Sequence, residues 1–157
     1  MQKIMITKEQ ITQLANEALD STDRFVVDIT VSKSNVIFVY IDADTSVTID
    51  HCVELSRFIE SRLDREIEDY ELSVSSAGID YPLLVNRQFK KYVEKDLEIL
   101  HNDGVKKIYK LLSYNEEKIE VQEAVIKMLG KLKKTKYGET VELYLKDIKE
   151  IKPYINF

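Results

Sequence analysis

The apolar side chains of the first forty or so residues have the spacing of a helix at first and the spacing of two strands afterwards. Over residues 7–20, isoleucine, leucine and alanine recur on one helical face, and Thr7 with Gln10 makes a capping-box pair at the start. Residues 25–31 and 36–41 are β-branched and aromatic runs separated by four polar residues. This pattern predicts a helix followed by a β-hairpin.

A second helix and a third strand are predicted next. From residue 49 or 50 to residue 64 the spacing is helical, and the apolar side consists of Cys52, Leu55, Ile59 and Leu63. Residues 70–74 alternate between apolar and polar side chains as a strand does. The first part of the chain therefore has the predicted order αββαβ, which belongs to the α+β class.

The second half of the chain changes to the spacing of short strands. Turn-forming residues at 75–82 mark a junction, which predicts one domain over residues 1–83 and another over residues 84–157. A short helix is expected at residues 86–92. Strands are expected at residues 97–100, 107–112, 119–128 and 140–145, followed by a helical turn around residues 148–151 and a closing strand. Five short strands with tight turns predict a small β-barrel of the SH3 or Sm type.

The acidic net charge hides an uneven distribution along the chain. The formal net charge is -5, but residues 1–85 hold 7 basic and 16 acidic side chains, whereas residues 86–157 hold 16 basic and 12 acidic ones. An acidic first half can attract a basic protein segment, although the same acids can serve as helix caps and solvated turns. The second half has a net positive charge, which tolerates or attracts a partner that carries phosphate groups. The two halves thus predict different partners.

Composition disfavours several classes of protein. The longest apolar run, residues 36–41, is too short to cross a bilayer, and Lys8 and Glu9 interrupt the N-terminus before a secretory signal develops. Cys52 has no second cysteine to pair with, and His51 and His101 lack the spacing of a zinc site. We expect a cytoplasmic protein with no metal and no cofactor, a buried thiol at Cys52, and a capping or surface role for His51.

One segment of the second half is rich in lysine. Its RNA-binding candidates are Lys127, Lys131, Lys133, Lys134, Lys136 and the adjacent Tyr137. Ammonium groups clustered on a mobile loop would neutralise phosphates in a salt-dependent and sequence-tolerant way, and the tyrosine ring would stack on an exposed base. The alternative is a solvated loop that keeps a barrel edge from aggregating.

The turn after the third predicted strand is a second candidate. Its residues for docking a partner protein or a phosphate are Ser75, Ser76, Gly78 and Asp80. The same residues can equally make a tight connection between two domains. Because no Gly-x-Ser-x-Gly elbow surrounds these serines, and neither histidine is placed to act as their base, we do not expect an enzyme.

Two stretches of the first half resemble the hallmark segments of RimP ribosome maturation factors. Residues 48–57, reading Thr-Ile-Asp-His-Cys-Val-Glu-Leu-Ser-Arg, carry the first, and residues 70–83, reading Tyr-Glu-Leu-Ser-Val-Ser-Ser-Ala-Gly-Ile-Asp-Tyr-Pro-Leu, carry the second. The chain departs from the family pattern at His51, Ser73, Ala77 and Tyr81, which replace an acidic residue, a glutamate, a proline and an arginine. Because Tyr81 lacks the basic side chain of the arginine that it replaces, an RNA contact at this position is less favoured than in the family pattern.

The resemblance covers essentially the whole chain. It implies a KH-like or ferredoxin-like layered first domain and an Sm-like β-barrel second domain. It also implies a monomer that assists assembly of the small ribosomal subunit by binding its rRNA and a ribosomal protein, without catalysis. Two alternatives stay open, namely a general RNA-binding regulator with an Sm-like barrel and a protein-only adaptor that works through the acidic domain.

Overall fold

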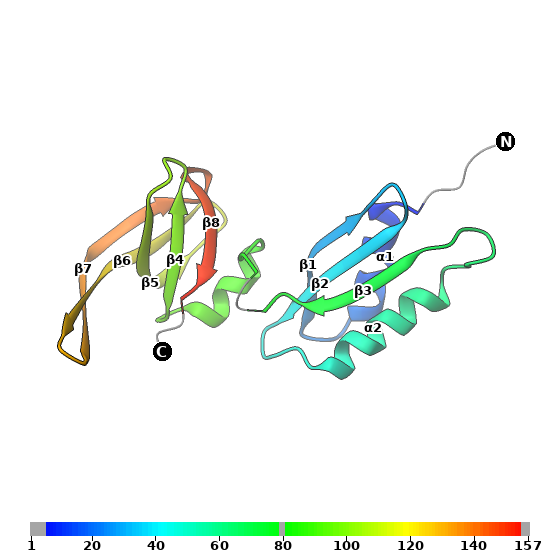
Figure 1. Cartoon of the computed structure of the whole chain (residues 1–157), viewed down its shortest axis with the longest axis horizontal. Coiled ribbons are helices and arrows are strands. Elements are labelled where there is room, and N and C mark those ends of the chain that lie inside the picture. Colours follow the sequence, from blue (N-terminus) through cyan, green and yellow to red (C-terminus); the bar gives the residue numbers. More distant parts are fainter. Residues whose placement is uncertain (1–5, 79–80, 155–157) are drawn as a thin grey trace. The chain divides into compact units, whose positions relative to one another are not determined.

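The structure, a computed structural model, describes residues 6–78 and 81–154 of the chain. The chain forms two compact units, Met1–Gly78 and Ile79–Phe157 (Figure 1). Each unit has its own cluster of buried apolar side chains, as expected of a separate folding unit. The domain boundary expected after residue 83 stays a prediction.

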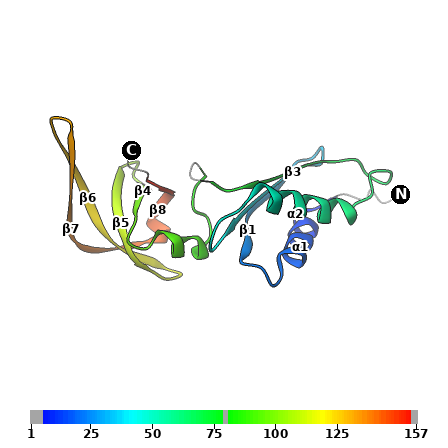
Figure 2. The same ribbon diagram turned by 90° about the horizontal axis from the view of Figure 1, so that it is seen from below.

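The first unit has the predicted order of elements. These are α1 (Lys8–Leu19), β1 (Arg24–Val31), β2 (Val36–Ala43), α2 (Ile49–Ser61) and β3 (Glu71–Ser76). β1 pairs antiparallel with β2, and β2 pairs parallel with β3, which gives the sheet order β1-β2-β3. Both helices lie on one face of this sheet (Figure 2). The predicted α+β class and αββαβ order are confirmed.

The core of the first unit lies between the sheet and the two helices. Successive side chains of a strand point to opposite faces, and on β2 the inward set of Ile37, Val39 and Ile41 is fully buried. The helices contribute Ile11, Ala15, Leu55 and Ile59. Cys52 packs against this core but is only partly buried, and this burial raises the pKa of its thiol.

Side chains accept from some of the free N–H groups at the start of both helices, but only α2 has a complete capping box, and the one predicted for Thr7 and Gln10 has one of its two bonds. At α1, the Thr7 hydroxyl accepts a hydrogen bond from the Gln10 N–H (3.1 Å). At α2, the Thr48 hydroxyl accepts from the His51 N–H (3.2 Å), and His51 Nδ1 accepts in return from the Thr48 N–H (3.1 Å). His51 therefore caps the helix, as expected.

Replacing His51 with alanine removes one half of the α2 cap. We expect the free energy of unfolding of the first unit to fall by about 0.5–1 kcal/mol, because the Thr48 N–H loses its acceptor. His51→Gln is the matched control, since a glutamine at this position can also accept from Thr48. Urea unfolding followed by circular dichroism measures both variants. Equal losses in the two would contradict the capping role.

The second unit is an antiparallel sheet of five strands preceded by a short helix, η1 (Asn86–Tyr92). The strands are β4 (Asp96–His101), β5 (Lys106–Tyr114), β6 (Lys118–Leu129), β7 (Leu132–Tyr144) and β8 (Ile148–Pro153), in the sheet order β7-β6-β5-β4-β8. Its fully buried apolar side chains are Leu97, Ile99, Leu111, Ile119 and Val121. The four strands predicted at residues 97–100, 107–112, 119–128 and 140–145 are present as β4 to β7, and the helix at residues 86–92 is a 3-10 helix.

This sheet is open at both edges within the described residues. β7 pairs with β6 and β8 pairs with β4, but no ladder joins β7 to β8 there. The SH3 or Sm-like barrel expected from the sequence is therefore not closed. Closure would need the two edge strands to stagger until their backbones meet. Instead β8 is only six residues long, and much of β7 continues beside β6 beyond the reach of β5.

The end of the chain differs from its prediction. The helical turn expected around residues 148–151 belongs to strand β8, and a 3-10 turn, η2 (Leu145–Asp147), precedes it. Ile151 is buried and lies opposite Ile99 of β4. Ile148 and Ile151 have the three-residue spacing of a helical turn, but here the cross-strand packing of Ile151 favours the strand.

Candidate nucleic-acid interface

The lysine-rich segment is the far end of the β6–β7 hairpin, seen at the lower left of Figure 1. The prediction of a mobile loop at this place is wrong, because β6 and β7 pair with each other as far as Leu129 and Leu132. Gly130 and Lys131 form the two-residue turn. Gly130 has φ +62°, and a positive φ at the first central position is typical of the two-residue turns of β-hairpins.

A β-bulge divides this hairpin into two parts. Between Gln122 and Ala124 the register shifts, so that one residue on β6 faces two on β7. Strand β5 pairs with β6 only as far as Glu123. Beyond the bulge, β6 and β7 therefore pair with each other alone within the described chain. We call this part, residues 124–137, the arm.

The arm presents its lysines on two faces. In an antiparallel ladder, residues directly opposite share a face, and the faces alternate along each strand. Lys127 lies opposite Lys134, and Lys136 follows two residues along β7 on the same face. Lys133 lies on the other face, and Lys131 is in the turn. All five side chains are exposed, but the structure brings only Lys127, Lys134 and Lys136 together on one face.

Tyr137 is held by side chains of its own unit. Its hydroxyl donates to Asp96 Oδ1 of β4 (3.0 Å), and the Lys110 ammonium of β5 lies 4.7 Å from its ring centroid. Burial, followed by the hydrogen bond to Asp96, raises the pKa of the Tyr137 hydroxyl. The ring that we expected to stack on a base is thus partly covered by Lys110. No sequence signal indicates this contact, because 41 residues separate Asp96 from Tyr137.

The second candidate site lies at the end of β3. Ser75 and Ser76 pair with Tyr40 and Ile41 of β2, and both serines are exposed. The Ser75 hydroxyl donates to the Ser76 carbonyl (3.0 Å), and Gly78 has φ +67°, a left-handed conformation that disfavours other residues. Asp80 lies outside the described residues. The serines and Gly78 therefore form the end of a strand and its turn.

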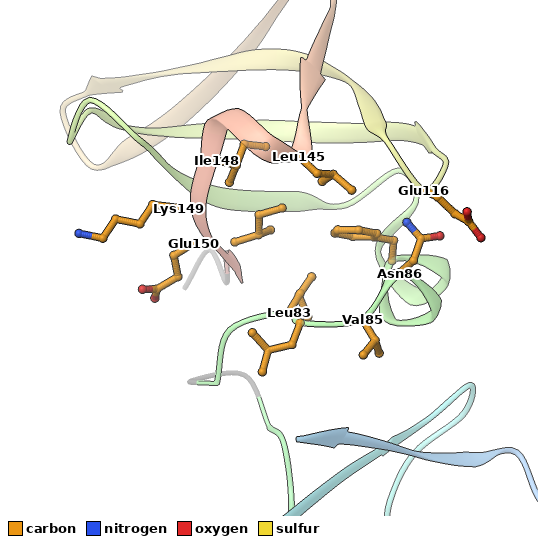
Figure 3. Close-up of a pocket in the computed structure, with 11 residues that line it drawn as sticks. Leu83, Val85, Asn86, Glu116, Leu145, Ile148, Lys149 and Glu150 are labelled. Atoms are coloured by element: carbon orange, nitrogen blue, oxygen red, sulfur yellow. The ribbon is translucent and has the colours of Figure 1, made fainter. Parts of the chain in front are cut away.

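A cavity of about 300 Å³ lies in the second unit (Figure 3). Its walls are mainly apolar and include Leu83, Val85, Phe89, Leu145 and Ile148. The charged ends of Glu116, Lys149 and Glu150 extend away from its centre (Figure 3). An active site usually gathers polar or titratable groups toward one point. This cavity instead offers an apolar surface without such a group.

The described residues contain no group of three or more His, Cys, Asp or Glu side chains arranged to hold a metal ion. None of the helices in that part of the chain is long and apolar enough to cross a membrane. The only cysteine, Cys52, is a free thiol. The arm is therefore the feature whose chemistry most directly suggests a ligand, because it gathers positive charge at an exposed site.

Comparison with known proteins gives the same family along most of the chain. The family model of the RimP N-terminal domain matches residues 14–80. A ribosome maturation factor RimP from Porphyromonas gingivalis is 35% identical over 147 residues, which cover 93% of this chain and 97% of the relative. Proteins of the same name from Christiangramia forsetii and Cytophaga hutchinsonii are each 34% identical, over 96% and 78% of this chain and 99% and 78% of their own lengths. The chain belongs to the RimP family of ribosome maturation factors.

Proposed function

We propose that this protein assists maturation of the small ribosomal subunit by binding its rRNA and a basic ribosomal protein. The relatives bear the name ribosome maturation factor, which supports a role in ribosome maturation. We propose that it acts in the cytoplasm as a monomer and that binding, without a chemical step, is its whole activity. We also assign the second unit to the SH3 or Sm-like class, supported by its antiparallel sheet of five strands.

The observation that carries the RNA contact is the charge of the arm. Residues 124–137 contain five lysines and no acidic residue. Within the described chain, Lys127, Lys131, Lys134 and Lys136 take part in no ion pair. Five other lysines of the same unit do pair with carboxylates, namely in Lys106–Glu98, Lys107–Glu123, Lys110–Glu94, Lys118–Glu142 and Lys152–Glu150. These four arm lysines thus have no carboxylate partner in the described part of the chain, which favours a polyanion as their ligand.

The type of cation indicates how the RNA is held. Lysine is a point charge without the planar fork that lets arginine read a base edge. Ammonium groups on the arm therefore suit the phosphate backbone, which positions a protein without reading sequence. The same chemistry would serve a general RNA-binding regulator, so affinity for free RNA must be compared with affinity for subunits.

A protein contact is proposed for the first unit. Its sequence carries a large excess of acidic over basic side chains, which complements a basic ribosomal protein. Ser75, Ser76, Gly78 and Asp80 remain our candidates for this docking contact. By binding the assembling subunit better than the mature one, the protein would stabilise an intermediate and leave as that surface closes.

The test is co-sedimentation with small subunits isolated before and after maturation. We expect stronger binding to immature subunits, and a loss of about a hundredfold in affinity between about 50 and 200 mM salt if five phosphates are neutralised. Free oligouridine serves as competitor. Equal or stronger binding to mature subunits would contradict the proposal, and equal affinity for oligouridine would favour the general RNA-binding regulator. Salt-insensitive binding would favour a protein-only adaptor.

A further inference from the structure

The two faces of the arm differ in what they already contact. The face with Tyr137 is tied to the outer surface of the sheet through Asp96 and Lys110. Lys133 lies on this face, opposite Met128. The other face carries Lys127, Lys134 and Lys136, whose ammonium groups have no acidic partner among the described residues. Only this second face combines exposure with uncompensated charge.

The geometry of that second face is unfavourable without a ligand. Lys127 and Lys134 are directly opposite each other across the ladder, and like charges at such positions repel. Lys136 lies two residues from Lys134, about 7 Å along the strand. Nearby apolar residues, Leu129 and Leu132, are exposed to 61% and 73% and offer no counter-charge. An anion between the lysines would remove this repulsion.

The three lysines also suit more than a single isolated anion. Two are side by side on neighbouring strands and the third follows along β7. A chain of phosphates passing over the face would meet all three in turn. The tether of Tyr137 to Asp96 and the bulge before Ala124 fix the root of the arm against the sheet. The face is thus presented in one direction before any ligand arrives, which reduces the entropy lost on binding.

We propose that one face of the arm, carried by Lys127, Lys134 and Lys136, is the surface that takes the RNA phosphate backbone, and that Lys133 on the opposite face is not part of it. This inference rests on the proposed function and refines it from five lysines to three. It also implies that Lys127 and Lys134 repel each other in the free protein and that bound RNA removes this repulsion.

The test compares two variants of equal charge in the full-length protein. One is Lys127→Gln, Lys134→Gln and Lys136→Gln together. The control is Lys33→Gln, Lys95→Gln and Lys133→Gln, which removes three exposed lysines outside the proposed face. Fluorescence anisotropy with labelled oligouridine, over a range of salt concentrations, gives affinity and salt slope. We expect about tenfold or greater weakening and a slope smaller by about 2 for the first variant, and little change for the control.

Hydrogen exchange of the free proteins supplies a second readout. Removing the opposed charges should slow exchange of the amides near Gly130 in the first variant although its RNA affinity falls, because the repulsion is gone. Equal weakening in both triple variants would overturn the assignment to one face, because the loss of affinity would then follow the total charge and not the position of the lysines. Unchanged affinity in both would overturn RNA binding by the arm itself.

Discussion

Replacing Leu97 with alanine is expected to lower the free energy of unfolding of the second unit by about 2–5 kcal/mol. Leu97 is fully buried in β4, which pairs with β5 on one side and β8 on the other. Removing its branched side chain leaves a cavity that two flanking strands hold open. Urea unfolding monitored by hydrogen exchange should show the loss in the second unit, with amides of β2 in the first unit still protected.

The matched control for this change is Leu132→Ala. The same atoms are removed, but the Leu132 side chain is 73% exposed at the end of the arm. We expect its effect on the free energy of unfolding to stay within about 0.5 kcal/mol. If the two variants lost similar stability, or if Leu97→Ala unfolded both units at once, the separation into two cores would be incorrect.

Periodicity predicts the first unit well because its elements are long and one-sided. Residues 7–20 and 49–64 were expected as helices, and α1 and α2 fall inside these ranges. Local chemistry also predicts turns that need a special backbone. The Asp-Gly pair at residues 103 and 104 is typical of a hairpin turn, and Gly104 has φ +90° between β4 and β5. In such segments the local preference and the tertiary structure agree.

The arm and the open sheet could not be predicted in the same way. Residues 132–139 contain lysines, threonine and glycine in no clear alternation, so nothing local indicates a strand. They become part of β7 because the ladder with β6 satisfies their backbone groups. Pairing also decides on which face of the hairpin each of the arm lysines lies. The sequence alone shows only that Lys127, Lys133, Lys134 and Lys136 are close together along the chain. Likewise, the contact of Tyr137 with Asp96 depends on sheet order, a property of the whole unit.

Replacing all five arm lysines with glutamine should produce the second large effect, a loss of about a hundredfold in affinity for immature small subunits at about 50 mM salt. Under the proposed function, neutralisation of phosphates by the arm lysines would release condensed counterions, whereas glutamine would release none. The fold should persist, because all five side chains are exposed. The matched control replaces five exposed lysines outside the arm, Lys8, Lys33, Lys95, Lys146 and Lys149, and removes the same charge.

The decisive readout is rRNA processing in cells whose only copy of this protein is the variant without arm lysines. Unprocessed small-subunit rRNA should accumulate there and also in cells without the protein, whereas the control variant should restore processing. If the variant were present at normal levels and processing were complete, the lysine arm would have no part in ribosome maturation.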